Sequence, residues 1–87
     1  MTKEEIYAMR FRELVTEQAL RHGVRPLALK FVVRDAEAVF ELRDDALVPR
    51  NHAVDPSDPL QPLSPARWLQ GLAKVEPYLF ASPGAAH

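Results

Sequence analysis

Three histidines are the side chains of this sequence best suited to hold a metal ion or to carry a proton at neutral pH. They are His22, His52 and His87. The surrounding pattern places the first at a helix end, the second in a loop and the third at the terminus. None has a second histidine or a carboxylate at the spacing that brings two metal ligands together on one helix. The histidines therefore predict no metal site.

Two pairs of carboxylates are candidates for general acid–base catalysis, which often uses two carboxyl groups. They are Glu4–Glu5 and Asp44–Asp45. Neighbouring side chains on a helix or turn point in different directions, so a helix-start charge pattern and a turn explain these pairs better. The serines lack a G-x-S-x-G context, and the three glycines form no phosphate-binding loop. The sequence predicts no catalytic residue and no cofactor, and we expect a protein that is not an enzyme.

A group of large side chains near the C-terminus is a stronger candidate, and the chemistry that it favours is recognition. It consists of Arg67, Trp68, Tyr78, Leu79 and Phe80. Aromatic residues and arginine are enriched at protein interfaces and at their hot spots. The last three follow a helix-ending proline and precede a tail of small residues, which favours a peripheral cluster that anchors a partner. Trp68 can instead belong to the core, where the lone tryptophan of a small protein usually lies.

The length, composition and net charge of the chain limit the classes of protein to which it can belong. It has 87 residues, 47% of them hydrophobic, no cysteine and a formal net charge of −1. We expect one small domain over 1–80, of modest stability, and a flexible tail over 81–87. The lack of cysteine excludes a disulfide scaffold, and the mixed charges argue against nucleic acid as a partner. No apolar run approaches ~20 residues and no signal region begins the chain, so we expect no membrane segment in a soluble intracellular protein.

The first element that positions these side chains is a helix within 1–22. Thr2 and Glu5 match a capping box, and Gly23 is the residue type expected just past a helix C-terminus. The apolar side of this helix is broad and comprises Ile6, Tyr7, Met9, Phe11, Leu14, Val15, Ala19 and Leu20. Packing of the whole side within its own domain is the interpretation that we favour. The alternative is that part of it meets a second copy of the chain, and the candidates for this self-association are Tyr7, Phe11, Leu14 and Val15.

The remaining elements predict an α+β fold that is mainly helical. A second helix covers 26–38 and begins at a proline, and a short β-hairpin covers 39–49 around an acidic turn. A C-terminal helix covers 64–76, with Ser64 as its N-cap. The intervening segment, 50–63, is rich in proline and is expected to be a loop.

Two interpretations of that loop stay open. In the first it covers the surface of the domain, with Leu60 and Leu63 as its anchors. In the second its three prolines, each three residues from the next, form a polyproline II docking motif. The covering loop is the interpretation that we favour.

Several segments also occur in the order found in a known group of proteins. They are Gly23-Val24-Arg25-Pro26, Val39-Phe40-Glu41-Leu42, Leu47-Val48-Pro49, Asp58-Pro59-Leu60, Pro62-Leu63-Ser64-Pro65 with Trp68-Leu69, and Pro77-Tyr78-Leu79-Phe80. As an ordered set over about 19–87, they resemble the C-terminal region of small scaffold-like proteins of tailed bacteriophages. The chain departs from that pattern at Asp44–Asp45, where the group has a glycine. It also has Glu76 where the group often has alanine and Tyr78 where it often has histidine.

The resemblance implies a non-enzymatic phage or prophage protein that acts in capsid assembly or structure. Its partner would be a capsid-type protein, with homo-oligomers as a further expectation. It would act in the cytoplasm of the bacterial host or within the procapsid or virion. The alternative is a small phage-encoded inhibitor or adaptor that binds a host protein complex. A DNA-binding regulator is disfavoured, because its only basic element would carry Arg25, Lys30 and Arg34 among apolar residues.

Overall fold

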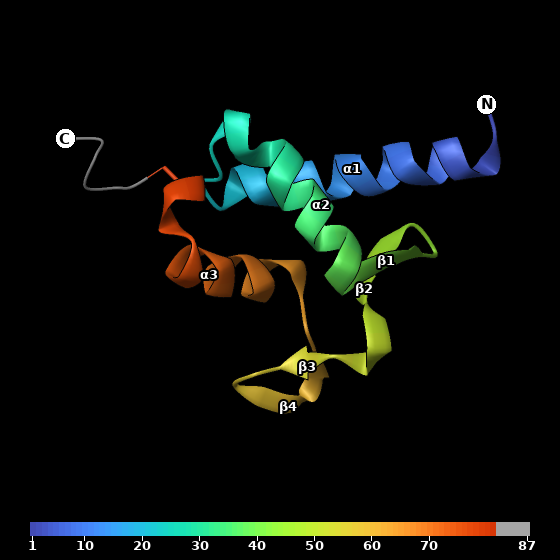
Figure 1. Ribbon diagram of the computed structural model, residues 1–87. Coiled ribbons are helices and arrows are strands. Elements are labelled where there is room, and N and C mark those ends of the chain that lie inside the picture. The colour runs from blue at the N-terminus through green and yellow to red at the C-terminus, as the bar shows by residue number, and fades with distance from the viewer. Residues whose placement is uncertain (82–87) are drawn as a thin grey trace.

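The computed structural model describes residues 1–81 and has the mainly helical α+β fold that the sequence predicts (Figure 1). The expected tail lies, from residue 82 on, outside the described residues. The helices are α1 (Lys3–Arg21), α2 (Leu29–Val39) and α3 (Pro65–Val75), and three short 3-10 turns are η1 (Pro26–Ala28), η2 (Arg50–His52) and η3 (Pro77–Leu79). The strands are β1 (Phe40–Arg43), β2 (Ala46–Pro49), β3 (Val54–Asp55) and β4 (Asp58–Pro62).

The core lies where the three helices and the start of β1 come together (Figure 1). Its buried side chains are Phe11, Val15, Ala19, Val24, Ala28, Val32, Ala36, Phe40, Leu69, Leu79 and Phe80. The molecule measures 44 × 35 × 16 Å. Because packed helix axes are about 8–10 Å apart, a thickness of 16 Å holds only about two layers. Each helix therefore keeps a face in solvent.

The local signals at the helix ends are confirmed. The Thr2 hydroxyl accepts the N–H of Glu5 at 3.1 Å, and it donates to the Glu5 carboxylate at the same distance. The second bond differs from the expected capping box, in which that carboxylate would accept a backbone N–H. Gly23 follows α1 with a φ of +85°, the left-handed conformation that glycine adopts without strain. The Ser64 hydroxyl accepts the N–H of Arg67 at 3.1 Å and begins α3.

The predicted hairpin over 39–49 is present, with Phe40 paired to Pro49. Its turn places Asp44 and Asp45 at φ values of 51° and 61°, the geometry of the two-residue turns that suit hairpins. Aspartate tolerates this conformation better than most residues do. The carboxylate of Asp45 reaches α1 and not the turn backbone. It accepts two hydrogen bonds from the Arg10 guanidinium on α1, at 2.6 and 2.9 Å.

The segment 50–63 is not the loop that we expected, because it forms η2 and then a second hairpin, β3–β4. Leu60 is 89% exposed at this hairpin, so its predicted role as an anchor is wrong. Leu63 does pack against the core, and its N–H donates to the carbonyl of Ala53 at 3.0 Å. The hairpin projects from the rest of the molecule (Figure 1).

Candidate protein-binding surface

Two of the ordered sequence motifs, Gly23-Val24-Arg25-Pro26 and Pro77-Tyr78-Leu79-Phe80, lie side by side, although they are far apart in sequence. Val24 and Phe80 form an antiparallel backbone bridge. The N–H of Arg25 donates to the carbonyl of Leu79 at 2.9 Å, and its side-chain Nε donates to the carbonyl of Phe80 at 3.0 Å. These bonds fix η3 against the segment that leads from α1 into η1. The junction thus joins the two ends of the pattern into one structural unit.

This junction decides which of the three predicted C-terminal anchors a partner can reach. Leu79 and Phe80 are 8% and 7% exposed, so both side chains belong to the core. The expectation of a peripheral Tyr78-Leu79-Phe80 cluster is wrong for these two residues. The physical reason is the backbone bridge, which turns the chain inward after the helix-ending proline. Tyr78 points outward and is 69% exposed.

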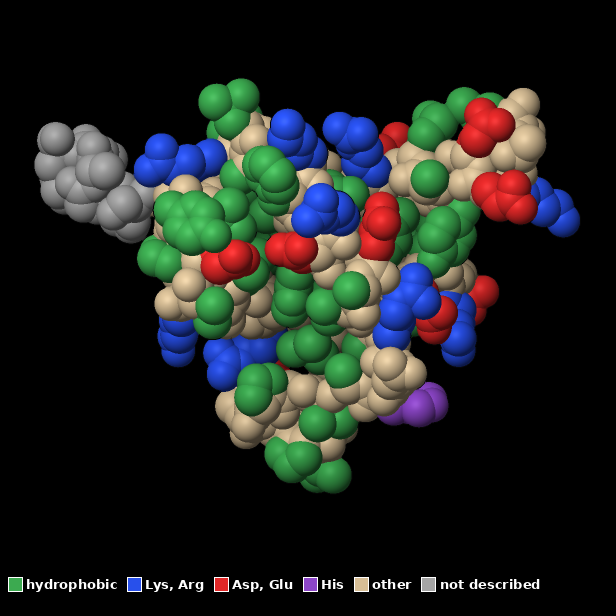
Figure 2. All heavy atoms as spheres, viewed as in Figure 1, with side chains coloured by type: hydrophobic (Ala, Val, Ile, Leu, Met, Phe, Trp, Pro, Cys, Tyr) green, Lys and Arg blue, Asp and Glu red, His purple; other side chains and the backbone are tan. Residues whose placement is uncertain are grey.

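Tyr78 belongs to a larger apolar surface that sequence reasoning missed. Leu27, at 90% exposed, and Phe31, at 47%, lie with it around a groove of about 460 Å³, and Ala28 and Leu79 form part of the lining. We call this feature the α2–η3 groove. Figure 2 shows hydrophobic side chains gathered over η1, the start of α2 and η3. The available signal was the excess of apolar residues in 27–33, more than a single buried helix face can hold.

The α2–η3 groove is lined in part by two carboxylates, those of Asp35 and Glu76. The Tyr78 hydroxyl donates to the Glu76 carboxylate at 3.0 Å. This hydrogen bond, together with the negative charges of Glu76 and Asp35, raises the pKa of Tyr78, because a phenolate would face two carboxylates. The phenol therefore stays neutral at physiological pH and keeps its hydrogen-bonding proton.

Cations also border the groove. Lys30 Nζ lies 5.2 Å from the centroid of the Phe31 ring, within the range of a cation–π contact, and Arg34 lines the groove one turn further along α2. Among residues 1–81, no ion pair includes Lys30, Arg34, Asp35 or Glu76. These four charges thus remain available to a partner at the rim of an apolar surface.

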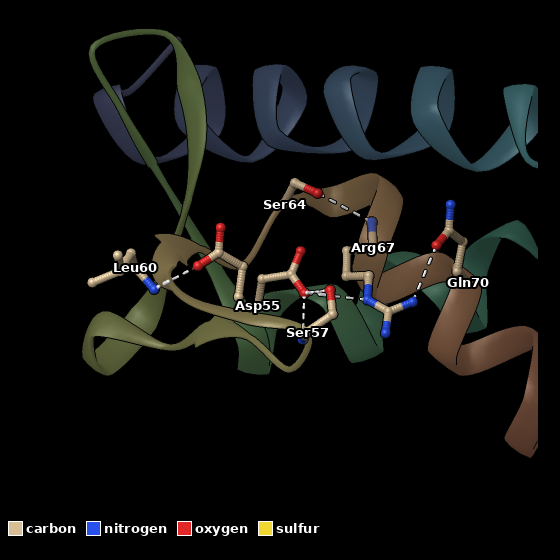
Figure 3. A network of polar contacts seen from close by, with 7 residues as sticks. Asp55, Ser57, Leu60, Ser64, Arg67 and Gln70 are labelled. Atoms are coloured by element: carbon tan, nitrogen blue, oxygen red, sulfur yellow. Dashed lines mark hydrogen bonds and ion pairs between the residues drawn. The ribbon is translucent and has the colours of Figure 1, made fainter.

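Arg67 and Trp68, the other predicted binding residues, have roles inside the fold. Arg67 Nε lies 3.4 Å from a carboxylate oxygen of Asp55, and its terminal nitrogen donates to the Gln70 side chain at 3.3 Å. Figure 3 shows the Arg67 side chain placed between these two groups, so it connects α3 to the β3–β4 hairpin. Trp68 is half-buried and meets the ring of Phe40 edge-on, at 5.7 Å between centroids. Neither residue lines the α2–η3 groove.

The four residues predicted for self-association also have different positions from those expected. Phe11 and Val15 are each 3% exposed and face the core of their own domain, so they cannot meet a second copy in this fold. Leu14 is half-buried. Tyr7 is 40% exposed, but its ring stacks on Phe11 and its hydroxyl accepts the N–H of Leu42 at 2.8 Å. Packing within the domain therefore accounts for this side of α1.

The described residues offer no arrangement typical of a metal centre. Across 1–81, no group of three histidines or carboxylates is placed to share a metal ion. In the same range, no helix has the length and the apolar character that crossing a membrane requires. Comparison with protein-family models, with curated proteins and with solved structures gave no match. The geometry and chemistry of the α2–η3 groove therefore carry the functional argument.

Proposed function

We propose that this chain is a non-enzymatic structural or capsid-assembly protein of a tailed phage or prophage, and that it binds a capsid-type protein through the α2–η3 groove. The observation that carries the proposal is the joint exposure of Leu27, Phe31 and Tyr78 around one groove. Large apolar side chains inside a polar rim are the usual composition of a protein-binding hot spot.

The phage part of the proposal rests on the resemblance of the ordered motifs. It gains support from the bridge between Val24 and Phe80, because two motifs of that pattern depend on each other for their structure. Two of the departures from the pattern favour a partner that is particular to this chain. Glu76 and Tyr78, which differ from the residues common in the group, both line the groove. A capsid-type protein recognised here would have to match this acidic and aromatic edge.

The chemistry of the groove limits what the bound segment can be. Its centre needs an apolar side chain from the partner, and its lining offers both cations and carboxylates. A polyanion would be repelled by Asp35 and Glu76, and its binding would leave the apolar centre exposed. An amphipathic segment with charges of both signs at its borders matches the apolar centre, the cations and the carboxylates of the groove.

The experiment is affinity capture of the tagged protein from its bacterial host, with mass spectrometry, for three forms of the chain. The test variant carries Leu27→Ala and Tyr78→Ala, two exposed side chains whose loss leaves the core intact. The matched control carries Val54→Ala and Leu60→Ala, two exposed apolar side chains on the β3–β4 hairpin. We expect the wild type and the control to recover a capsid-type protein, and the test variant to recover at least about tenfold less.

Two outcomes contradict the proposal in different ways. Equal recovery by the test variant would remove the α2–η3 groove as the binding site. Recovery of a host enzyme or defence complex at fixed stoichiometry, lost in the test variant, would keep the groove and replace assembly with the function of an inhibitor or adaptor. Circular dichroism of all three forms checks that the fold is unchanged.

A further inference from the structure

Helix α1 has a second apolar stripe on the side opposite the core. Its core-facing residues include Phe11 and Val15. Ile6, Met9 and Leu20, in contrast, are 53%, 50% and 48% exposed. At 100° per residue, these three point about 140° away from the buried side. Nothing in the described part of the chain covers them, so α1 is apolar on two faces.

The outer stripe has the spacing of a coiled-coil seam. It comprises Thr2, Ile6, Met9, Glu13, Thr16 and Leu20, which alternate by four and three residues. In heptad terms, Ile6, Glu13 and Leu20 occupy a positions, and Met9 and Thr16 occupy d positions. This period of 3.5 residues is the one that keeps a stripe in continuous contact with a second helix.

The charges beside the stripe identify the partner helix and its direction. Glu5 and Arg12 occupy g positions, and Arg10 and Glu17 occupy e positions. In a parallel, in-register pair, each g residue faces the e residue five positions further along the second helix. Glu5 would then face Arg10 of the second copy, and Arg12 would face Glu17, so both contacts join opposite charges. Full antiparallel overlap would instead oppose Arg10 to Arg10 and Arg12 to Arg12.

We propose that α1 pairs with α1 of a second copy of this chain, as a parallel, in-register two-stranded coil with Ile6, Met9 and Leu20 in the seam. Ile6, Met9 and Leu20 are not among the four residues that the sequence predicted for self-association. The pairing also does not involve the α2–η3 groove, so the two proposals can fail independently. Arg12 takes part in no ion pair among residues 1–81. Glu17 of the second copy, which lies 3.0 Å from Arg21 of its own helix, would share its carboxylate between Arg21 and Arg12.

Glu13 sets the strength of this pairing. Its side chain is 61% exposed and bonds to Arg10 at 3.0 Å, but in the paired state two Glu13 side chains would face each other at the centre of the seam. A polar residue at one a position lowers the stability of a coil while it restricts register. The wild-type dimer is therefore weak and depends on protein concentration.

The first test is sedimentation equilibrium of the full chain. Replacing the repelling pair by Glu13→Leu should tighten the dimer at least about tenfold, since it buries leucine in place of two like charges. Met9→Glu should leave only monomer. Leu60→Glu, a charge placed on an exposed leucine of β4, should behave as wild type. If the Glu13→Leu variant is monomeric at every concentration, the inference is wrong.

The second test determines direction, and the absence of cysteine from the chain makes it simple. In a parallel pair, the Ile6→Cys variant and the Thr16→Cys variant should each form a disulfide-linked homodimer under mild oxidation, because like positions lie side by side. In the antiparallel arrangement, Ile6 faces Thr16. Crosslinks that appear only when the two variants are mixed would therefore overturn the parallel assignment.

Discussion

The β1–β2 hairpin and the β3–β4 hairpin are separated by only a short turn, yet only the first contributes a side chain to the core. Phe40 at the start of β1 is 1% exposed and meets Trp68 edge-on. No residue of β3 or β4 is buried. Polar contacts hold the second hairpin to α3, chiefly the pair between Asp55 and Arg67 (Figure 3).

The two hairpins show how similar elements of one fold acquire different stability. Burial of an aromatic side chain joins β1–β2 to the cooperative unit of the protein, and the contact of Arg10 with Asp45 adds to it at the surface. The Asp55–Arg67 contact has no such support. The Nε of Arg67 is buried and has no hydrogen bond, so even this contact is incomplete. We therefore expect β3–β4 to open locally at a cost well below global unfolding.

The largest expected effect is that of Phe40→Ala. Removing this buried ring should lower the free energy of unfolding by about 3–5 kcal/mol, a large part of the total for a domain of this size. The measurement is thermal unfolding followed by Trp68 fluorescence. Leu60→Ala, on the other hairpin, should change the free energy of unfolding by less than about 0.5 kcal/mol. A loss below about 1 kcal/mol for Phe40→Ala would mean that the first hairpin is not anchored by burial.

A smaller and local effect is expected from Arg67→Met, which keeps the aliphatic stem and removes the guanidinium. Amide hydrogen exchange in β3–β4, including the Leu63 N–H that donates to Ala53, should become faster, while exchange in α1 stays unchanged. Arg43→Met is the matched control, since Arg43 pairs with Glu41 on the exposed surface of the first hairpin. Unchanged exchange in β3–β4 would show that Arg67 does not hold it.

Lowering the pH should produce the smallest effect, and the two hairpins should respond to it differently. Hydrogen bonds from Ser57, with the nearby Arg67 charge, lower the pKa of Asp55, and hydrogen bonds from Arg10 lower the pKa of Asp45. Both carboxylates therefore stabilise the fold above the unfolded pKa of about 3.9 and lose this contribution as pH falls through their lower folded values.

Because Phe40 still holds the first hairpin, only β3–β4 should loosen in that acid range. Amide NMR shifts provide the measurement: the Ser57 signal should move below about pH 4, and the Leu42 N–H, which donates to Tyr7, should stay protected. Asp55→Asn should remove the Ser57 transition. If the Leu42 N–H lost its protection at the same pH at which the Ser57 signal moves, the two hairpins would not differ in stability as we expect.

The candidate site was only partly predictable from sequence. Tyr78 was correctly identified as a side chain that a partner can reach, whereas Leu79 and Phe80 are core residues. Leu27 and Phe31 were assigned to an apolar helix, but nothing in the sequence told which of its faces would remain uncovered. That outcome depends on η3, which lies on the other side of the groove from η1 and the start of α2 and leaves the groove open.

The sequence by itself determined where α1 begins and ends and where α3 begins. Thr2, Gly23 and Ser64 act on backbone groups within a few residues of themselves, so their effect does not depend on the rest of the fold. Only the tertiary structure decided which apolar side chains are buried. Arg25 and Phe80 lie 55 positions apart, and their contact turns Phe80 inward and leaves Tyr78 outside. Burial depends on such distant contacts because the apolar character of a side chain gives no direction of its own.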